Sequence, residues 1–323
     1  FCLSRGLGDV YKRQGWSDAG VFLPYFLWKM YADKRILEES YPSMQAYAKF
    51  KIKTLGKHYM TSLPTGVGLK YRKYICNYGQ SYGEWSEPSD VSTFHWYDFM
   101  TTKPEESTAY TYFTLQRVLR IADILQKPKT KRLARIQKYS EGARRAYREL
   151  VTKPKFSLDT DRQAKLVRPL YMGLLTAEQE EFAKKRLIRA LENYGWRLGT
   201  GFLSTPFILF VLEKIGIEYA YKLLENEELP GWLVMPKYGA TTVWEDWEGD
   251  RAPDQNAASL NHYSKGAVCE WLMSEMCGIK VAGENQFALA PKPGGSLTYA
   301  KAEYQSIYGK VVCGWEKAEK GYQ

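Results

Sequence analysis

Residues 19–55 read AGVFLPYFLWKMYADKRILEESYPSMQAYAKFKIKTL, and this stretch decides the fold class. Apolar residues recur at the period of an α-helix over 19–32 and again over 36–55. Asp33 and Lys34 lie at the junction, so a tight turn must join the two segments. The stretch therefore predicts two antiparallel helices, the repeating unit of a paired-helix fold.

The same period predicts further helices along most of the chain. They lie at 107–125, after Pro128, and at 160–174, 177–194, 206–215, 217–226 and 259–277. Thr176 and Gln179 form a capping box ahead of the helix at 177–194. Thr205 and Pro206 predict the start of the next helix, and Gly216 its end. We expect about nine helices in pairs, which makes the chain mainly α.

Long aromatic and glycine-rich connections separate these helices at 56–106, 195–203 and 229–258. Loops of that length in a compact domain are usually functional or disordered. Disorder is poor in tryptophan, whereas these loops hold six Trp residues. Paired helices with such loops on one rim predict an α/α barrel with its functional site at that rim.

The pattern changes after Gly278. Apolar and polar residues alternate between glycine and proline turns, which predicts β-strands. The strands are too few for an independent sheet domain. We therefore expect the chain to stop inside a C-terminal β domain.

Composition narrows the class of protein. Hydrophobic residues make up 45% of the 323 residues and charged residues 25%, which excludes intrinsic disorder. The longest apolar run, 207–212, has six residues, far short of the roughly 18 that a membrane-spanning helix needs. Five scattered Cys and three His argue against a disulfide framework, a zinc ribbon and a His-rich metal site. We expect no metal and no cofactor.

The net charge of +10 raises the question of nucleic-acid binding. Residues 127–153 carry +8 of that charge, and the same segment keeps apolar residues from Leu133 to Leu150 at helical spacing. A solvated helix face explains this pattern better than a phosphate-binding surface does. We expect a helix on the outer wall and no nucleic-acid partner.

The strongest chemical signal is GATTVWEDWEGD, residues 239–250. Glycoside cleavage needs two carboxyl groups, and sugar rings pack their C–H faces on aromatic rings. Glu245 between Trp244 and Trp247 supplies both elements. The alternative is an acidic surface loop held by buried tryptophans.

Three other segments repeat the combination of an acid or a His with aromatic residues. LNHYSKGAV places His262 at a predicted helix start, where a structural histidine is the alternative. GWSDAGVFLPYFLW places Trp16 and Asp18 before an apolar helix, where Asp18 can also be a simple N-cap. YGEWSEP places Glu84 and Trp85 in a long loop.

Taken in order, these segments resemble the catalytic domain of bacterial α-L-rhamnosidases of glycoside hydrolase family 78. GWSDAGVFLPYFLWKMYADKRILEESYPSM resembles the family's Gly-Trp-Gly-Asp-Ala segment and the helix pair that follows it, and YGEWSEP resembles its Gly-Asp-Trp loop, with Glu84 for Asp. TGFLSTPFILFVL resembles Thr-Gly-Phe-x-Gly-Thr-Pro, with Ser204 for Gly. GATTVWEDWEGD and NHYSKGAV resemble the Ala-Thr-Thr-x-Trp-Glu-x-Trp loop and the Asn-His-Tyr helix.

The resemblance implies an (α/α)6 six-hairpin barrel at 15–278, lacking its N-terminal helices, and part of a C-terminal β-sandwich at 279–323. It implies hydrolysis of terminal α-L-rhamnosides, in rhamnose-containing glycosides or polysaccharides, by an inverting mechanism without a metal. Glu245 matches the general base and His262 a substrate-contacting residue. The sugar pocket is matched by Trp16, Asp18, Trp85 and Trp247. We expect all of these residues to converge on one rim pocket.

Two expectations concern the N-terminal part of the chain. Residues 1–14, FCLSRGLGDVYKRQ, show neither the helix period nor the strand period. They resemble a translated adaptor sequence, so we expect a non-native leader. In the family, an Asp-Cys-Pro stretch running through Arg-Glu precedes the first segment matched here and carries the general acid. Nothing in residues 1–14 matches it, so the chain alone is expected to be nearly inactive.

Two other classes of function stay open at this point. One is a non-catalytic α/α toroid that binds carbohydrate or a protein partner. The other is an (α/α)6 glycosidase or lyase of different specificity. An Asp-Cys-Pro to Arg-Glu motif in the coding sequence upstream of Gly15 would favour the rhamnosidase.

Overall fold

The computed structural model describes residues 17–57, 66–78, 81–92, 101–251, 258–283 and 286–323. The chain forms two compact units. The first comprises Phe1–Gly83, Phe94–Asp159 and Met172–Phe182, and the second Glu84–Thr93, Thr160–Tyr171 and Ala183–Gln323. The leader predicted at residues 1–14 lies outside the described residues.

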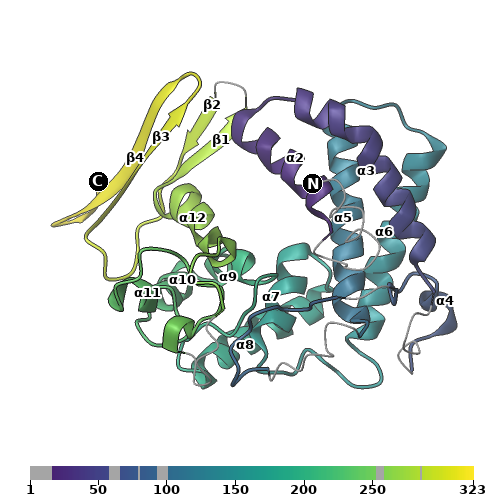
Figure 1. Ribbon diagram of the computed structural model, residues 1–323, viewed down its shortest axis with the longest axis horizontal. Coiled ribbons are helices and arrows are strands. Elements are labelled where there is room, and N and C mark those ends of the chain that lie inside the picture. The colour runs from purple at the N-terminus through teal and green to yellow at the C-terminus, as the bar shows by residue number, and fades with distance from the viewer. Residues whose placement is uncertain (1–16, 58–65, 79–80, 93–100, 252–257, 284–285) are drawn as a thin grey trace. The chain divides into compact units, whose positions relative to one another are not determined.

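The first unit is built on helix pairs (Figure 1). Its helices are α2 (Ala19–Tyr31), α3 (Arg35–Thr54), α4 (Leu69–Arg72), α5 (Pro104–Ile124) and α6 (Lys131–Leu150). The α2–α3 pair agrees with the prediction to within one residue at each end. Apolar stripes of α2, α3, α5 and α6 form one core, with Val21, Leu37, Leu115 and Ile136 almost fully buried.

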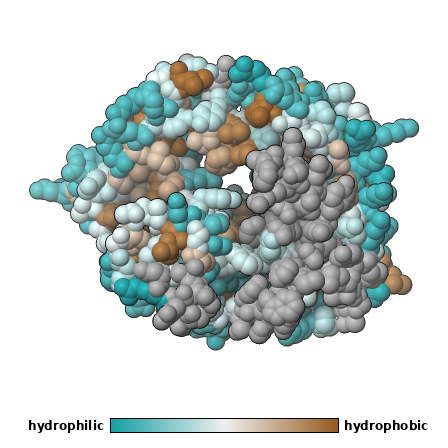
Figure 2. Space-filling view, in the orientation of Figure 1, coloured by the Kyte–Doolittle hydropathy of each residue, from teal (hydrophilic) through white to brown (hydrophobic). Residues whose placement is uncertain are grey.

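The basic segment folds as predicted into an amphipathic helix, α6. Ile136, Ala143, Tyr147 and Leu150 are buried, and Thr130 caps its start by accepting a hydrogen bond from the backbone N–H of Leu133. Most of its charged side chains are exposed, and hydrophilic residues gather at the edge where α3 and α6 lie (Figure 2). Arg148 differs from the others, because its guanidinium donates to the carbonyls of residues 174 and 175.

Two helices, α7 (Gln163–Met172) and α8 (Ala177–Asn193), have residues in both units. The predicted capping box opens α8: the Thr176 hydroxyl accepts from the Gln179 N–H at 3.3 Å, and the Gln179 side chain accepts from the Thr176 N–H at 3.0 Å. Such a motif depends only on residues three positions apart, which makes it readable from sequence.

The second unit contains α9 (Thr205–Ile215), α10 (Ile217–Leu224), α11 (Val234–Lys237) and η2 (Gly249–Arg251), followed by η3 (Ser264–Ala267), α12 (Val268–Trp271) and η4 (Leu272–Met276). The N-cap position of α9 is held by Ser204 instead of Thr205, one position earlier than predicted, and its side chain makes no capping hydrogen bond. Pro206 lies in the first turn and Gly216 ends the helix, as predicted.

The predicted helix at 259–277 is wrong in its first part and irregular in the rest. Residues 259–263 form a loop, and three short turns of 3₁₀, α and π type follow it. The backbone of this loop bonds to another loop: the Glu245 N–H donates to the Ser259 carbonyl at 2.8 Å, and the His262 N–H to the Val243 carbonyl at 2.7 Å. These long-range bonds replace the helical ones.

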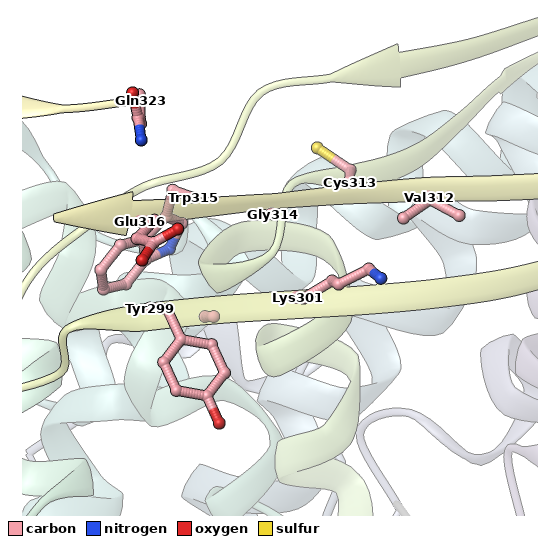
Figure 3. A pocket seen from close by; sticks show the side chains of 9 residues that line it. Tyr299, Lys301, Val312, Cys313, Gly314, Trp315, Glu316 and Gln323 are labelled. Carbon is pink, nitrogen blue, oxygen red and sulfur yellow. The ribbon is translucent and has the colours of Figure 1, made fainter. Parts of the chain in front are cut away.

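The C-terminal segment forms antiparallel strands, as predicted. β1 (Ile279–Gly283) pairs with β2 (Gln286–Leu289), and β3 (Tyr299–Ser306) pairs with β4 (Gly309–Ala318), which pairs with β5 (Gly321–Tyr322). A shallow hollow of about 630 Å³ lies over β3 and β4, lined among others by Tyr299, Lys301 and Trp315 (Figure 3). The indole of Trp315 donates to the Met276 carbonyl at 3.0 Å and joins this sheet to the last helical turn.

Candidate active site

Glu245 lies in a loop of the second unit that the segment 259–262 holds by the two backbone hydrogen bonds described above. Four residues further on, Gly249 has φ +56°, and a Cβ there would come within 2.2 Å of the Trp244 ring. Glycine is therefore required for the loop to fold back over the buried Trp244. The WEDWEG segment is thus held by backbone pairing and by a buried indole.

The Glu245 carboxylate is partly exposed and has a donor on each oxygen. The indole Nε1 of Trp85 donates to Oε1 at 3.1 Å, and the backbone N–H of Ser259 donates to Oε2 at 3.1 Å. A carboxylate oxygen accepts more than one hydrogen bond, so both oxygens keep capacity for a water or a sugar hydroxyl. The carboxylate is thus oriented by two donors while part of its surface stays open to solvent.

Trp85 is held in place by the buried residue before it. Glu84 forms an ion pair with Arg168 at 2.7 Å, and both side chains are almost fully buried. Ser204 donates to the same carboxylate through its backbone N–H at 3.0 Å and through its hydroxyl. Glu84 and Ser204, two of the residues that depart from the family pattern, therefore bind each other.

A close approach of two backbones completes the anchoring of this loop. The Phe202 N–H donates to the Trp85 carbonyl at 2.9 Å. A Cβ on Gly201 would lie 2.5 Å from that carbonyl oxygen, so only glycine fits. Two residues after Trp85, Glu87 pairs with Arg162, and burial raises the pKa of Glu87.

Lys265 contacts both the Glu245 loop and the loop that carries Trp85 and Ser86, and its side chain is fully buried. Its Nζ donates to the Glu245 carbonyl at 2.6 Å and to the Ser86 hydroxyl at 3.0 Å, and it lies 4.0 Å from the centre of the Trp247 ring. Burial lowers the pKa of Lys265 to about 7, against the opposing effect of nearby carboxylates.

His262 and Trp247 occupy different depths. His262 is partly exposed between the rings of Phe202 and Tyr263, and its Nδ1 accepts from the Ser264 N–H at 3.4 Å. In the neutral imidazole this places the proton on Nε2, which can donate to a ligand. Trp247 is only 1% exposed, and its indole donates to the Thr200 carbonyl at 3.1 Å.

Asp18 belongs to the first unit and is fully buried. It forms an ion pair with Lys51 at 2.8 Å and accepts a hydrogen bond from the Tyr47 hydroxyl at 2.7 Å. Asp18 precedes α2, but its side chain makes no capping bond; its backbone carbonyl accepts from Val21 and Phe22. Oδ1 of Asp18 is therefore committed to a buried pair, and the side chain does not cap the helix.

The structure thus brings four of the predicted residues, Glu245, Trp85, His262 and Trp247, into one cluster of the second unit, with the Trp247 side chain buried. Convergence of Asp18 on that cluster stays a prediction, and Trp16 lies outside the described residues. Sequence reasoning missed Ser86 and Lys265. The one signal for Lys265 was that it lies three residues after His262, within the segment LNHYSKGAV that was selected for that histidine.

In the described part of the chain, no group of three or more His, Cys, Asp or Glu side chains is arranged to hold a metal ion. The helices described there include none that is long and apolar enough to cross a membrane.

Comparison with known proteins gives two family matches. Residues 4–276 match the bacterial alpha-L-rhamnosidase 6 hairpin glycosidase domain, and residues 280–323 match the bacterial alpha-L-rhamnosidase C-terminal domain. Together with the observed order of helices and strands, these matches confirm the predicted fold class. The domain bounds 15–278 and 279–323 stay predictions.

Similar proteins and structures agree with these matches. An alpha-L-rhamnosidase of Streptomyces avermitilis is 32% identical over 320 residues, which are 95% of this chain and 28% of that protein. An alpha-L-rhamnosidase of Formosa agariphila is 30% identical over 311 residues, which are 94% of this chain and 31% of that protein. The chain therefore spans less than a third of the length of these relatives.

Among solved structures, the S. avermitilis alpha-L-rhamnosidase complexed with L-rhamnose has a TM-score of 0.76 at 28% identity, over 96% of this chain and 28% of that one. The alpha-L-rhamnosidase from Dictyoglumus thermophilum has a TM-score of 0.77 at 27% identity, over 95% of this chain and 32% of that one.

Proposed function

The chain belongs to the bacterial alpha-L-rhamnosidase 6 hairpin glycosidase family, and from this premise we propose that it forms part of an enzyme that hydrolyses terminal α-L-rhamnosides. The observation that supports this most directly is the Glu245 carboxylate, partly exposed and oriented through both oxygens by Trp85 and Ser259. Its substrates are rhamnose-containing glycosides or polysaccharides.

Glu245 acts as the general base. In an inverting glycosidase, one carboxylate takes a proton from water while an acid roughly 6.5–9.5 Å away protonates the leaving oxygen. The remaining hydrogen-bonding capacity of the Glu245 oxygens suits the first of these roles. Water held there attacks the anomeric carbon and releases rhamnose with inverted configuration.

The sugar is bound by the other predicted residues. Trp85 presents a partly exposed indole next to Glu245, suited to packing against the C–H face of a sugar. His262 offers Nε2–H to a hydroxyl. The family resemblance adds Trp16, Asp18 and Trp247 to the binding residues.

The test compares Glu245→Gln with the parent protein and with Glu227→Gln, a control in an exposed ion pair with Lys237. Each is expressed as the 323-residue chain and as the longest open reading frame that contains it. The amide keeps the shape of the side chain but cannot take a proton. Turnover of para-nitrophenyl α-L-rhamnoside should fall at least about 100-fold. The L-rhamnose Kd should stay within about twofold, a change of only about 0.4 kcal/mol in binding free energy.

Proton NMR of the parent reaction should show the β anomer of rhamnose first. Near-normal turnover by Glu245→Gln would show that the base is elsewhere. A parent protein that binds L-rhamnose but hydrolyses no rhamnoside in either form would instead support a carbohydrate-binding toroid.

A further inference from the structure

We propose that Lys265 is a positioning residue for Glu245: its buried amine ties the Glu245 main chain to Ser86 and so sets where the carboxylate lies. This inference rests on the proposed function, since it explains how the base is held. It concerns a residue that does not touch the sugar and acts through its two hydrogen-bond partners.

The hydrogen bonds form a continuous chain between two loops. Lys265 Nζ donates to the Glu245 carbonyl and to the Ser86 hydroxyl, which lies 2.5 Å from Oδ1 of Asp246 and 2.7 Å from the Glu245 carbonyl. A hydroxyl has one proton to donate. Because Lys265 already serves the Glu245 carbonyl, the Ser86 proton is free for the Asp246 carboxylate, and both residues of the loop are held.

The backbone of Ser86 supports a role beyond packing. Its φ of +58° lies in the left-handed region, which is unfavourable for a serine. Such strain persists only where the surroundings hold it, and it concentrates at functional sites. The hydrogen bond from Lys265 is one of the contacts that hold this residue, directly after Trp85.

The partners of Lys265 are unusual for a buried lysine. Lys51, also buried, forms a direct ion pair with Asp18. Lys265 instead has a carbonyl, a hydroxyl and the Trp247 ring as its close partners, while the nearby acidic side chains are Glu245, Asp246 and Glu248. Burying an ammonium without a direct carboxylate partner costs stability, and we infer that the benefit is placement of the base.

The consequence of losing the amine follows from these contacts. Without it, the single Ser86 proton cannot serve both the Glu245 carbonyl and the Asp246 carboxylate, so one of them loses its donor and the loop that carries them gains freedom. A displacement of about 1 Å at a catalytic group can cost about 100-fold in rate. The loss should therefore appear in kcat, whereas sugar binding through the rings of Trp85 and His262 should change little.

The test compares Lys265→Met, which keeps the length of the side chain, with Lys265→Arg, which keeps the charge. The control is Lys292→Met, which removes ion pairs to Glu213 and Glu275 away from Glu245. kcat and KM for para-nitrophenyl α-L-rhamnoside, the L-rhamnose Kd and the melting temperature are measured for each variant in the active form of the protein.

We expect Lys265→Met to lower kcat about 10- to 100-fold with KM and Kd within about threefold, and Lys265→Arg to recover part of the loss. Removing the positive charge near Glu245 should also move the acidic limb of the pH profile of kcat/KM upward. Lys292→Met should lower the melting temperature without moving that limb.

A Lys265→Met protein with parental kcat and an unmoved acidic limb would overturn the inference. Should that variant not fold, Ser86→Ala decides, because it breaks the same link from the other side and should lower kcat in the same way. Glu245→Gln is run alongside: if the parent is active and Glu245→Gln inactive while Lys265→Met is normal, only this inference fails. If the parent hydrolyses no rhamnoside, the proposed function fails.

Discussion

The indole Nε1 of Trp85 donates a hydrogen bond to Oε1 of Glu245 over 3.1 Å, although 160 positions separate the two residues in the sequence. An aromatic residue and a carboxylate from different loops are thus coupled directly. The indole orients the Glu245 carboxylate, and in the proposed function it also packs against the sugar.

Trp85→Phe separates these two functions of the indole. The substitution keeps an aromatic ring but removes the indole N–H that donates to Glu245, so the carboxylate loses one of its two orienting bonds. We expect kcat for para-nitrophenyl α-L-rhamnoside to fall about 10- to 100-fold, because a hydrogen bond to a charged group contributes about 1.5–3 kcal/mol. KM should change less than kcat.

Trp196→Phe is the matched control, because Trp196 is a largely buried indole that stacks on Tyr219 rather than on the site. Its kcat should be that of the parent. Equal losses of kcat in both variants would point to general destabilisation, and a purely KM effect in Trp85→Phe would remove the orienting role.

The buried pair of Glu84 and Arg168 should contribute strongly to folding. Glu84→Ala removes the carboxylate that pairs with the buried Arg168 guanidinium and that accepts from Ser204. Breaking a buried ion pair by removing one partner typically costs about 3–5 kcal/mol. We expect a loss of this size in the free energy of unfolding from urea denaturation.

Glu227→Ala, which removes the exposed pair with Lys237, should leave the same transition almost unchanged. A Glu84→Ala protein as stable as the parent would show that Arg168 finds another partner, and the anchoring of the Trp85 loop would need a different explanation.

The lowered pKa of Lys265 predicts a specific pH dependence of stability. Its pKa is about 7 in the folded chain against the ordinary lysine value of 10.5, so between these pH values the unfolded chain binds more protons at this site. The contribution of Lys265 to the free energy of unfolding therefore increases as pH rises from about 7 to about 10.5, and below pH 7 the full cost of burying the charge remains.

This dependence is measured as the difference in unfolding free energy between the parent and Lys265→Met across pH 6 to 10, in which other titrating groups cancel. The difference should shift in favour of the parent as pH rises. A flat difference would mean that Lys265 keeps its ordinary pKa in the folded protein.

Features that depend on neighbours along the chain were readable from the sequence. The α2–α3 pair, the apolar stripe of α6 and the capping box at Thr176 all depend on residues three or four positions apart. The C-terminal segment could be predicted as strands because apolar and polar residues alternate there, again a pattern of near neighbours. Glu245, Trp85 and His262 could be selected because acid and aromatic residues recur together in long loops.

Features that depend on partners far away in the chain could not be predicted from the sequence. The helix predicted at 259–277 begins late because its first residues bond to the loop at 243–245. Asp18 looked like an N-cap, yet its partner Lys51 lies one helix further along the chain. No local pattern shows which carboxylate a buried cation will meet.

By itself, then, the sequence determined that this protein is a chain of paired helices followed by strands, and which loops carry its acids and tryptophans. Local periodicity and composition contain that information. Only the tertiary structure decided that Lys265 lies between Glu245 and Ser86, and that Glu84 is an anchor rather than a reactive group. The reason is physical: burial and hydrogen bonds between residues that lie 20 to 179 positions apart set these roles, and both exist only once the chain has folded.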